Sequence, residues 1–406
     1  MTTAPRGWRR EQLAYCSNVH PGESLEAVYA NLVDHIDAVR RRCGLERLNT
    51  GLWLSGEAAE RLLNEDGQLK HFSDLLARLQ LDLTTFNGFP YGNFHAEAVK
   101  HAVYRPDWSD PRRLDYTIAL ASILSACLSD DHPGGTISSL PLGYASLWSY
   151  EQHAKAVDAL CKLCVKLDDS FRRGNAPVQV CLEMEPGCVL ESTADAIRLF
   201  ERNLRPAAEA LGLSLETLHR HIGVCFDVCH QAVQFEDVYT SLQRLHDAGV
   251  PVGKIQLSSA LDVPQPAASR ALLNDFCEPR YLHQTRRRAA DGSVHGVDDL
   301  PDALSDNNEE NLADSDPWRV HFHLPLQVGT LEADGLGTTR DSVERVFDWL
   351  AQPDVPMPHL EVETYTWHVL PPSLRPTDDE SLHRGIAAEL AWASGALDAR
   401  GLLMDN

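Results

Sequence analysis

Short apolar runs alternate along most of the chain with longer stretches in which apolar residues recur at helical spacing. Short apolar runs bounded by turn signals are typical of buried strands, and apolar residues at every third or fourth position are typical of helices packed on a sheet. The pattern predicts strands over 13–20, 49–55, 81–86, 135–140, 179–187, 224–227, 252–259 and 360–367. It predicts helices over 23–42, 57–64, 68–80, 112–129, 146–171, 193–211, 237–248, 338–351 and 379–396.

This alternation predicts an α/β fold with parallel strands, because parallel neighbours must be joined by right-handed crossovers that usually contain a helix. Strand–helix units repeat seven times before residue 260. That rhythm favours a closed (β/α)8 TIM barrel over an open doubly wound sheet, which would also need a Gly-x-Gly-x-x-Gly turn that we do not find. We expect a single barrel domain over 1–406, since this length accommodates a barrel with insertions.

The alternation of strands and helices is interrupted between 262 and 317. We interpret this segment as an insertion between the seventh strand and the seventh helix. It begins with a predicted helix over 269–278, followed by a predicted hairpin in which 280–288 and 294–297 flank the turn signal Asp291-Gly292. Its end, 298–316, holds eight acidic residues and no Lys or Arg, which predicts a disordered segment. Long barrel insertions usually cover the active face or form a subunit contact, so a homo-oligomer stays open.

Polar residues that can bind metal recur at the ends of the predicted strands. Asp227 and His230 follow the apolar run of the sixth strand with the spacing Asp-x-x-His. Glu183 ends the fifth strand, Gln256 lies in the seventh and Glu363 in the eighth. A further apolar run over 320–326, interpreted as a strand, carries His321 and His323. Because the carboxyl ends of barrel strands meet at one face, these side chains are expected to converge there.

Two divalent-metal sites are compatible with these residues. One combines Glu183, Asp227, Gln256 and Glu363, with Glu183 and Glu363 as the catalytic acid and base; an amide oxygen in place of imidazole suits Mn better than Zn. The other combines His230, His321 and His323, an all-imidazole set typical of Zn. We therefore expect Zn, Mn or Co. The alternative for His321 and His323 is an inward-facing pair bonded to acceptors in the core. Glu361 is expected to lie one layer deeper than Glu363, and Glu185 already in a loop before Pro186.

Composition limits the partners. The formal charge of −23 opposes binding to nucleic acid or to an anionic membrane, since both need a basic surface. No apolar stretch reaches the roughly 20 residues of a transmembrane helix, so membrane insertion is not expected, and 1–11 does not resemble a secretory signal. The ten cysteines have no framework spacing, which indicates a reducing, cytoplasmic location. A small polyol or sugar-like substrate is more compatible with this composition than nucleic acid or a membrane. The candidate residues for contacting it are His20, Asn87, His95 and His283.

The strand-end pattern resembles the xylose isomerase-like barrels, in which a Glu, an Asp-x-x-His, a further ligand and a Glu end strands five to eight. A second set of motifs spans almost the whole chain: Leu-Ala-Tyr-Cys-Ser-Asn-Val-His-Pro-Gly-Glu (13–23), Thr-Phe-Asn-Gly-Phe-Pro-Tyr-Gly (85–92), Tyr-Leu-His-Gln (281–284), Trp-Arg-Val-His-Phe-His-Leu-Pro-Leu (318–326) and His-Leu-Glu-Val-Glu-Thr-Tyr-Thr-Trp (359–367). These segments resemble the EboE family of metabolite traffic proteins encoded in Ebo clusters. Together the two resemblances imply a metal-dependent isomerase or epimerase acting on a sugar- or cyclitol-like polyol in a small-molecule pathway. A metal-dependent phosphoester hydrolase and a non-catalytic metabolite carrier are the alternatives.

Overall fold

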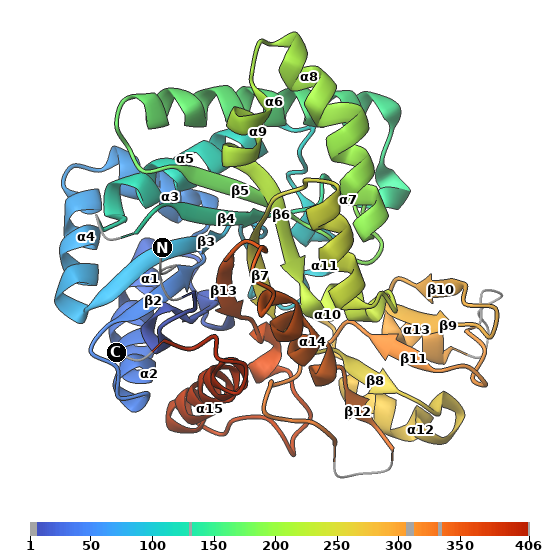
Figure 1. The fold of residues 1–406 in the computed structure, drawn as a ribbon. Helices are drawn as coiled ribbons and strands as arrows, with labels where there is room; N and C mark the ends of the chain where they lie inside the picture. Colours follow the sequence, from blue (N-terminus) through green and yellow to red (C-terminus); the bar gives the residue numbers. More distant parts are fainter. Residues whose placement is uncertain (1–5, 130–131, 306–311, 332–334, 405–406) are drawn as a thin grey trace.

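The computed structural model describes residues 6–129, 132–305, 312–331 and 335–404. Its main sheet has eight strands in the order β1-β13-β7-β6-β5-β4-β3-β2, and all neighbouring pairs are parallel (Figure 1). The strands are β1 (Ala14–Tyr15), β2 (Leu48–Leu52), β3 (Leu81–Asn87), β4 (Gly135–Ser139), β5 (Val178–Glu183), β6 (Ile222–Asp227), β7 (Val252–Leu257) and β13 (His359–Val362).

A parallel bridge between Cys16, which directly follows β1, and Gly51 of β2 joins the two edges of this sheet and closes the ring. The predicted (β/α)8 TIM barrel is therefore confirmed, and each of the eight strands predicted for it overlaps a strand of the ring. The first strand is much shorter than predicted. It gives way at Ser17 to a turn of 3-10 helix, because the chain bends there into the face above the barrel.

Amphipathic helices surround the ring and bury their apolar sides against it (Figure 1). Several begin at a residue whose side chain accepts from the first turn: Ser55 caps α3, and Ser149 with Gln152 forms a capping box on α6. The helices around the barrel are α1 (Leu25–Asn31), α2 (Asp37–Arg42), α3 (Gly56–Asn64), α4 (Gln68–Leu79), α5 (Pro111–Cys127), α6 (Tyr150–Arg172), α7 (Thr193–Leu199), α8 (Arg205–Ala210), α9 (Leu215–His221), α10 (Val228–Val233), α11 (Val238–Asp247), α14 (Arg340–Leu350) and α15 (Asp379–Asp398).

A second, antiparallel sheet of five strands lies beside the barrel, in the order β10-β9-β11-β8-β12 (Figure 1). Its hairpin of β9 and β10 turns at Asp291-Gly292, where Gly292 has a φ of +86° that only glycine adopts freely. The strands are β8 (Leu261–Val263), β9 (Thr285–Arg288), β10 (Val294–Val297), β11 (Trp318–Val320) and β12 (Gly337–Thr338); the helices of this region are α12 (Pro266–Leu273) and α13 (Leu300–Leu304).

The strand predicted over 320–326 is wrong in extent and in place. Strand β11 ends at Val320 and belongs to the small sheet, and the residues from His321 to Leu326 form no strand. Its amides bond in several directions: that of Phe322 donates to Val320 O at 2.8 Å and that of Leu324 to Ser259 O at 2.8 Å. The alternating pattern therefore reflects burial on both sides, not pairing in a ladder.

The acidic segment 298–316, predicted to be disordered, lies partly outside the described residues, at 306–311. Its described beginning includes α13, which is capped by Asp299, and its described end leads into β11. None of the helices in the described part of the chain combines the length and apolar composition needed to span a bilayer. All ten cysteines are described, and none forms a disulfide.

Candidate functional site

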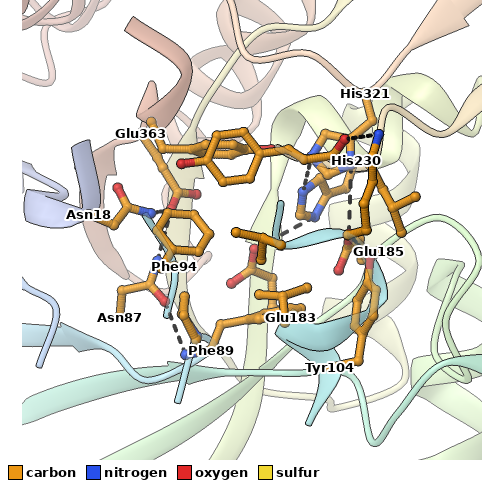
Figure 2. A pocket seen from close by; sticks show the side chains of 17 residues that line it. Asn18, Asn87, Phe89, Phe94, Tyr104, Glu183, Glu185, His230, His321 and Glu363 are labelled. Carbon is orange, nitrogen blue, oxygen red and sulfur yellow. Dashed lines mark hydrogen bonds and ion pairs between the residues drawn. The ribbon is translucent and has the colours of Figure 1, made fainter. Parts of the chain in front are cut away.

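A cavity opens above the carboxyl ends of the barrel strands. Its floor contains the last residues of β3 and β5, Asn87 and Glu183, together with Asn18 after β1 and Glu363 after β13. Figure 2 shows Glu363 and the two asparagines on one side of this cavity, and His230, His321 and Glu185 on the other.

Three buried carboxylates meet beside this floor. One oxygen of each of Glu183, Asp227 and Glu363 lies within 4.8 Å of the others, and the three residues are 0–3% exposed. Burial, together with the charges of Glu363 and Asp227, raises the pKa of Glu183 well above its usual value. Burial and the charge of Asp227 do the same for Glu363. Such a cluster is unfavourable unless protons or a cation neutralise it.

Glu363 and Asp227 each have one carboxylate oxygen that accepts hydrogen bonds from the protein, whereas other oxygens of the cluster have no hydrogen-bond partner. Glu363 Oε1 accepts from the Asn18 and Asn87 amides, each at 2.8 Å. Asp227 Oδ1 accepts from the His230 backbone N–H at 2.9 Å and from the Ser258 hydroxyl at 2.8 Å. Asp227 Oδ2 and Glu183 Oε2 are buried and have no hydrogen-bond partner. The protein thus orients these carboxylates but leaves two of their oxygens without a hydrogen bond.

Three histidines beside the cluster share one tautomer, because the Nδ1 of each faces an oxygen acceptor. His230 Nδ1 donates to Met184 O at 2.9 Å, and His323 Nδ1 donates to Glu363 O at 2.7 Å. His321 Nδ1 donates to Gln284 Oε1 at 2.7 Å. Their Nε2 atoms therefore carry lone pairs, the form in which imidazole binds metal.

Burial also keeps the His321 and His323 rings uncharged. It lowers the pKa of His323 to about 4, and burial together with the neighbouring His230 lowers the pKa of His321 well below its usual value. The Nε2 atoms of His230 and His321 lie 3.0 Å apart, and in this tautomer neither carries a proton that could form a hydrogen bond between them. The Nε2 atom of His323 has no hydrogen-bond partner. This arrangement favours a proton or a cation between the rings.

Gln284 fixes the orientation of His321. Its amide donates to Tyr104 Oη at 2.9 Å, to Glu185 Oε1 at 3.0 Å and to Pro186 O at 3.1 Å, so its oxygen is left to face the imidazole. Tyr104 Oη donates to Glu185 Oε1 at 2.7 Å. Because Gln284 immediately precedes β9, the small sheet completes one side of the site.

The described residues contain four groups of three ligand atoms close enough to hold one ion. Asp227 belongs to two of them, so the carboxylate group and a mixed group with two histidines are continuous. Orphaned oxygens and bare Nε2 atoms in these groups fit a divalent cation. The groups are Glu183–Asp227–Glu363, Asp227–His230–His323, Glu185–His230–His321 and Cys229–His321–His323.

Gln256 is differently placed from the other predicted ligands. It pairs with Asp227 across β6 and β7 and is fully buried, but its Oε1 accepts from the Cys225 thiol at 3.0 Å, and it does not line the cavity. Below it, the Lys254 ammonium and the Glu361 carboxylate form a fully buried ion pair at 2.6 Å. Glu361 thus lies one layer beneath Glu363, as its strand position predicted.

Of the four predicted substrate contacts, Asn87 lines the cavity and three histidines do not. His20 bonds to the Tyr15 hydroxyl at 3.1 Å and stacks on His35. His95 Nε2 donates to Asn18 O at 2.8 Å and so supports a residue that lines the cavity. His283 bonds to His321 O and to Glu278 Oε1, each at 2.8 Å, which occupies both ring nitrogens.

Sequence reasoning missed several residues that form the site. Glu185 lies in the loop after β5, as predicted, but its place in the lining of the cavity, where it is 5% exposed, was not predicted. Its separation of two residues from Glu183 was the available signal. Tyr104 ends a short 3-10 helix and Gln284 lies just before β9, and neither segment has an apolar periodicity that could identify these residues.

No protein-family model matches the chain, and no curated protein does. Among solved structures, a D-allulose 3-epimerase from Methylomonas sp. is similar at 11% identity over 97% of this chain and 99% of that one, with a TM-score of 0.47. The probable 3-DHS dehydratase AsbF from Bacillus anthracis is similar at 13% identity over 93% and 97%, with a TM-score of 0.45. The IolI protein with a bound zinc atom is similar at 11% identity over 97% and 99%, with a TM-score of 0.47. At such identities and TM-scores this likeness assigns no activity to the chain.

Proposed function

We propose that the protein is a divalent-metal-dependent isomerase or epimerase of a neutral, sugar- or cyclitol-like polyol. The observation that carries this proposal is the buried group Glu183–Asp227–Glu363, which has unpartnered oxygens beside a small-molecule cavity. Isomerisation next to a carbonyl needs a cation that polarises oxygen and a carboxylate that moves a carbon-bound proton. The cluster contains residues for both tasks.

Asp227 and the lone pairs of His230 and His323, together with the nearby oxygens of Glu183 and Glu363, are the ligands that we assign to the ion. Mn, Co and Zn all accept such a mixed oxygen and nitrogen set. When bound, the ion supplies Lewis-acid chemistry that makes a proton next to a carbonyl more acidic. The Gln256 oxygen, bonded to the Cys225 thiol, is no longer needed in this set.

Glu183 and Glu363 are the residues to which we assign proton transfer. Burial and like charge raise the pKa of both, so each can exchange a proton under conditions where an exposed carboxyl cannot. The Asn18 and Asn87 amides fix Glu363 from one side, and Glu183 Oε2 has no hydrogen-bond partner in the protein. Both carboxylates line the cavity, where a substrate could meet them from different sides.

A hydrolase of phosphoesters is the second candidate, and one observation favours it. The Glu185–His230–His321 group could hold another ion near the carboxylates, and paired ions suit phosphoryl chemistry. Against it, the one permanently cationic side chain among the lining residues, Lys100, is paired with Asp299 and donates to Tyr281 O at 2.7 Å. Apart from the ions themselves, a phosphate would thus meet an acidic floor without a free cationic side chain among the lining residues.

The EboE-like segments support a place in a small-molecule pathway, and the ten cysteines without disulfides support a cytoplasmic location. We include both in the proposal. A carrier that binds a pathway metabolite without turnover is the third reading, and it predicts binding without any exchange of carbon-bound protons.

The test is solvent deuterium incorporation. Wild-type protein loaded separately with Mn²⁺, Co²⁺ and Zn²⁺ is incubated in D₂O with D-allulose, L-ribulose and a ketone of inositol. We expect deuterium next to the carbonyl of at least one, a loss of about 100-fold or more in Glu363→Gln, and no change in the exposed control Glu57→Gln. Absence of exchange with cleavage of a phosphoester would favour the hydrolase, and absence of both with binding would favour the carrier.

A further inference from the structure

We propose that the substrate is amphipathic: a neutral polyol ketone at the carboxylate floor that carries an apolar or aromatic group in the mouth of the cavity. This inference rests on the proposed function and adds the chemical class of the substrate. It follows from how polar and apolar groups are distributed in the cavity. Besides its carboxylates, the cavity is lined by the aliphatic side chains of Val99, Val103 and Leu282 and by the rings of Phe94, Tyr281 and Tyr365.

Three aromatic side chains from separate segments form one wall. Phe94 comes from the loop after β3, Tyr281 from the insertion and Tyr365 from the loop after β13. Their ring centroids lie 5.1 Å apart for Phe94–Tyr281, 5.6 Å for Phe94–Tyr365 and 4.9 Å for Tyr281–Tyr365. Phe94, Tyr281 and Val99 also share an apolar cluster with Trp53 that is separate from the barrel core. The wall is thus pre-formed.

Aromatic rings also stack on the faces of sugars, but the aliphatic lining argues for more than a bare sugar. Val99, Val103 and Leu282 carry no side-chain donor or acceptor. A hydroxyl group placed against them would lose its water and gain no partner, which costs free energy. A polyol with hydroxyl groups on every carbon would therefore fit this part of the cavity poorly.

The charges of the lining favour a neutral ligand. Glu183, Glu185 and Glu363 lie on the floor, and Lys100, the one lining residue with a permanent positive charge, is engaged by Asp299 and by backbone carbonyls of the insertion. An anionic substituent such as a phosphate would meet no free cation among the described lining residues. An uncharged apolar substituent would instead contact the aliphatic and aromatic side chains of the lining.

The experiment measures binding along a series of probes. Isothermal titration calorimetry with Mn²⁺-loaded protein compares D-allulose with its 6-O-methyl, 6-O-butyl and 6-O-benzyl ethers, in which the oxygens near the carbonyl are unchanged. We expect affinity to rise along the series, with the benzyl ether at least about tenfold tighter than the methyl ether. The double variant Val103→Thr/Leu282→Asn, which keeps side-chain volumes similar, should lose most of this gain. The matched control Val165→Thr, on the outer surface of α6, should keep it.

An affinity that is flat or falls along the series would overturn the inference, as would undetectable binding of the benzyl ether at its solubility limit. Retention of the full gain in the double variant would overturn it as well, because the gain would then come from another surface. The deuterium assay is read separately. Rising affinity without exchange in any probe would refute the proposed isomerisation and leave the substrate class standing.

Discussion

Replacing Glu183 by Gln should stabilise the metal-free protein. The carboxylate is buried, its Oε2 has no partner, and its ligand oxygen lies within 4.8 Å of those of Asp227 and Glu363. At this separation two unit charges repel by about 3 kcal/mol at an effective dielectric constant of about 20. Proton uptake relieves part of this repulsion, since the pKa of Glu183 is raised by burial and by its charged neighbours. We therefore expect a gain of about 1–3 kcal/mol in the free energy of unfolding.

The gain should depend on pH with a definite sign. A carboxyl with a raised pKa in the folded protein stabilises it fully at low pH, and this contribution is lost as pH rises through the folded-state pKa. The Gln variant does not titrate at this position. The difference in unfolding free energy between Glu183→Gln and wild type should thus be small in acid and grow as the pH rises.

The assay is urea denaturation of protein stripped with EDTA, repeated after addition of Mn²⁺ or Zn²⁺. Wild type should gain stability from the metal, and Glu183→Gln should gain much less. Glu278→Gln is the contrasting control, because that carboxylate accepts from His283 and from the backbone amides of Arg280 and Tyr281 and should lose stability when replaced. A metal-free Glu183→Gln protein less stable than wild type would refute the reasoning.

Three other outcomes are expected. Asp227→Asn should weaken Mn²⁺ binding, measured by calorimetry, by at least about tenfold while the metal-free fold persists, because Asp227 belongs to two of the ligand groups. Lys254→Met should destabilise the protein by about 3–5 kcal/mol in denaturant titrations by leaving Glu361 charged and unpaired in the barrel, and adding Glu361→Leu should restore much of the loss. Burial raises the pKa of Glu389 to about 7, so wild-type stability should fall relative to Glu389→Gln by about 3 kcal/mol as pH rises from about 4.5 to above 7.

The barrel could be predicted from the sequence because its strands are buried on both faces. A continuous apolar run such as Val-Cys-Phe before Asp227 would be unfavourable in contact with water, so it indicates a strand buried on both faces. The helices predicted between such runs recur at a regular interval. The convergence of Glu183, Asp227 and Glu363 follows from the same logic, since the ends of parallel strands meet at one face. For the barrel strands and the residues at their carboxyl ends, the local sequence pattern thus predicts what the tertiary structure shows.

The remainder of the site depends on contacts that no local pattern encodes. The alternation around His321 is the pattern of a strand, yet the backbone there leaves the small sheet and bonds elsewhere. The tautomer of His321 is set by Gln284, which lies 37 positions away in sequence, just before β9. Only the tertiary structure brings such pairs together, so their role could not be predicted.

The most direct test of the cation centre is anomalous diffraction from wild-type crystals equilibrated separately with Mn²⁺ and Zn²⁺. We predict a strong anomalous peak in contact with Asp227 Oδ2 and Glu183 Oε2, close to Glu363, and its loss in Asp227→Asn crystals. An empty carboxylate cluster at saturating concentrations of both metals, with the three side chains in the positions described above, would contradict the metal centre and the isomerase mechanism built on it.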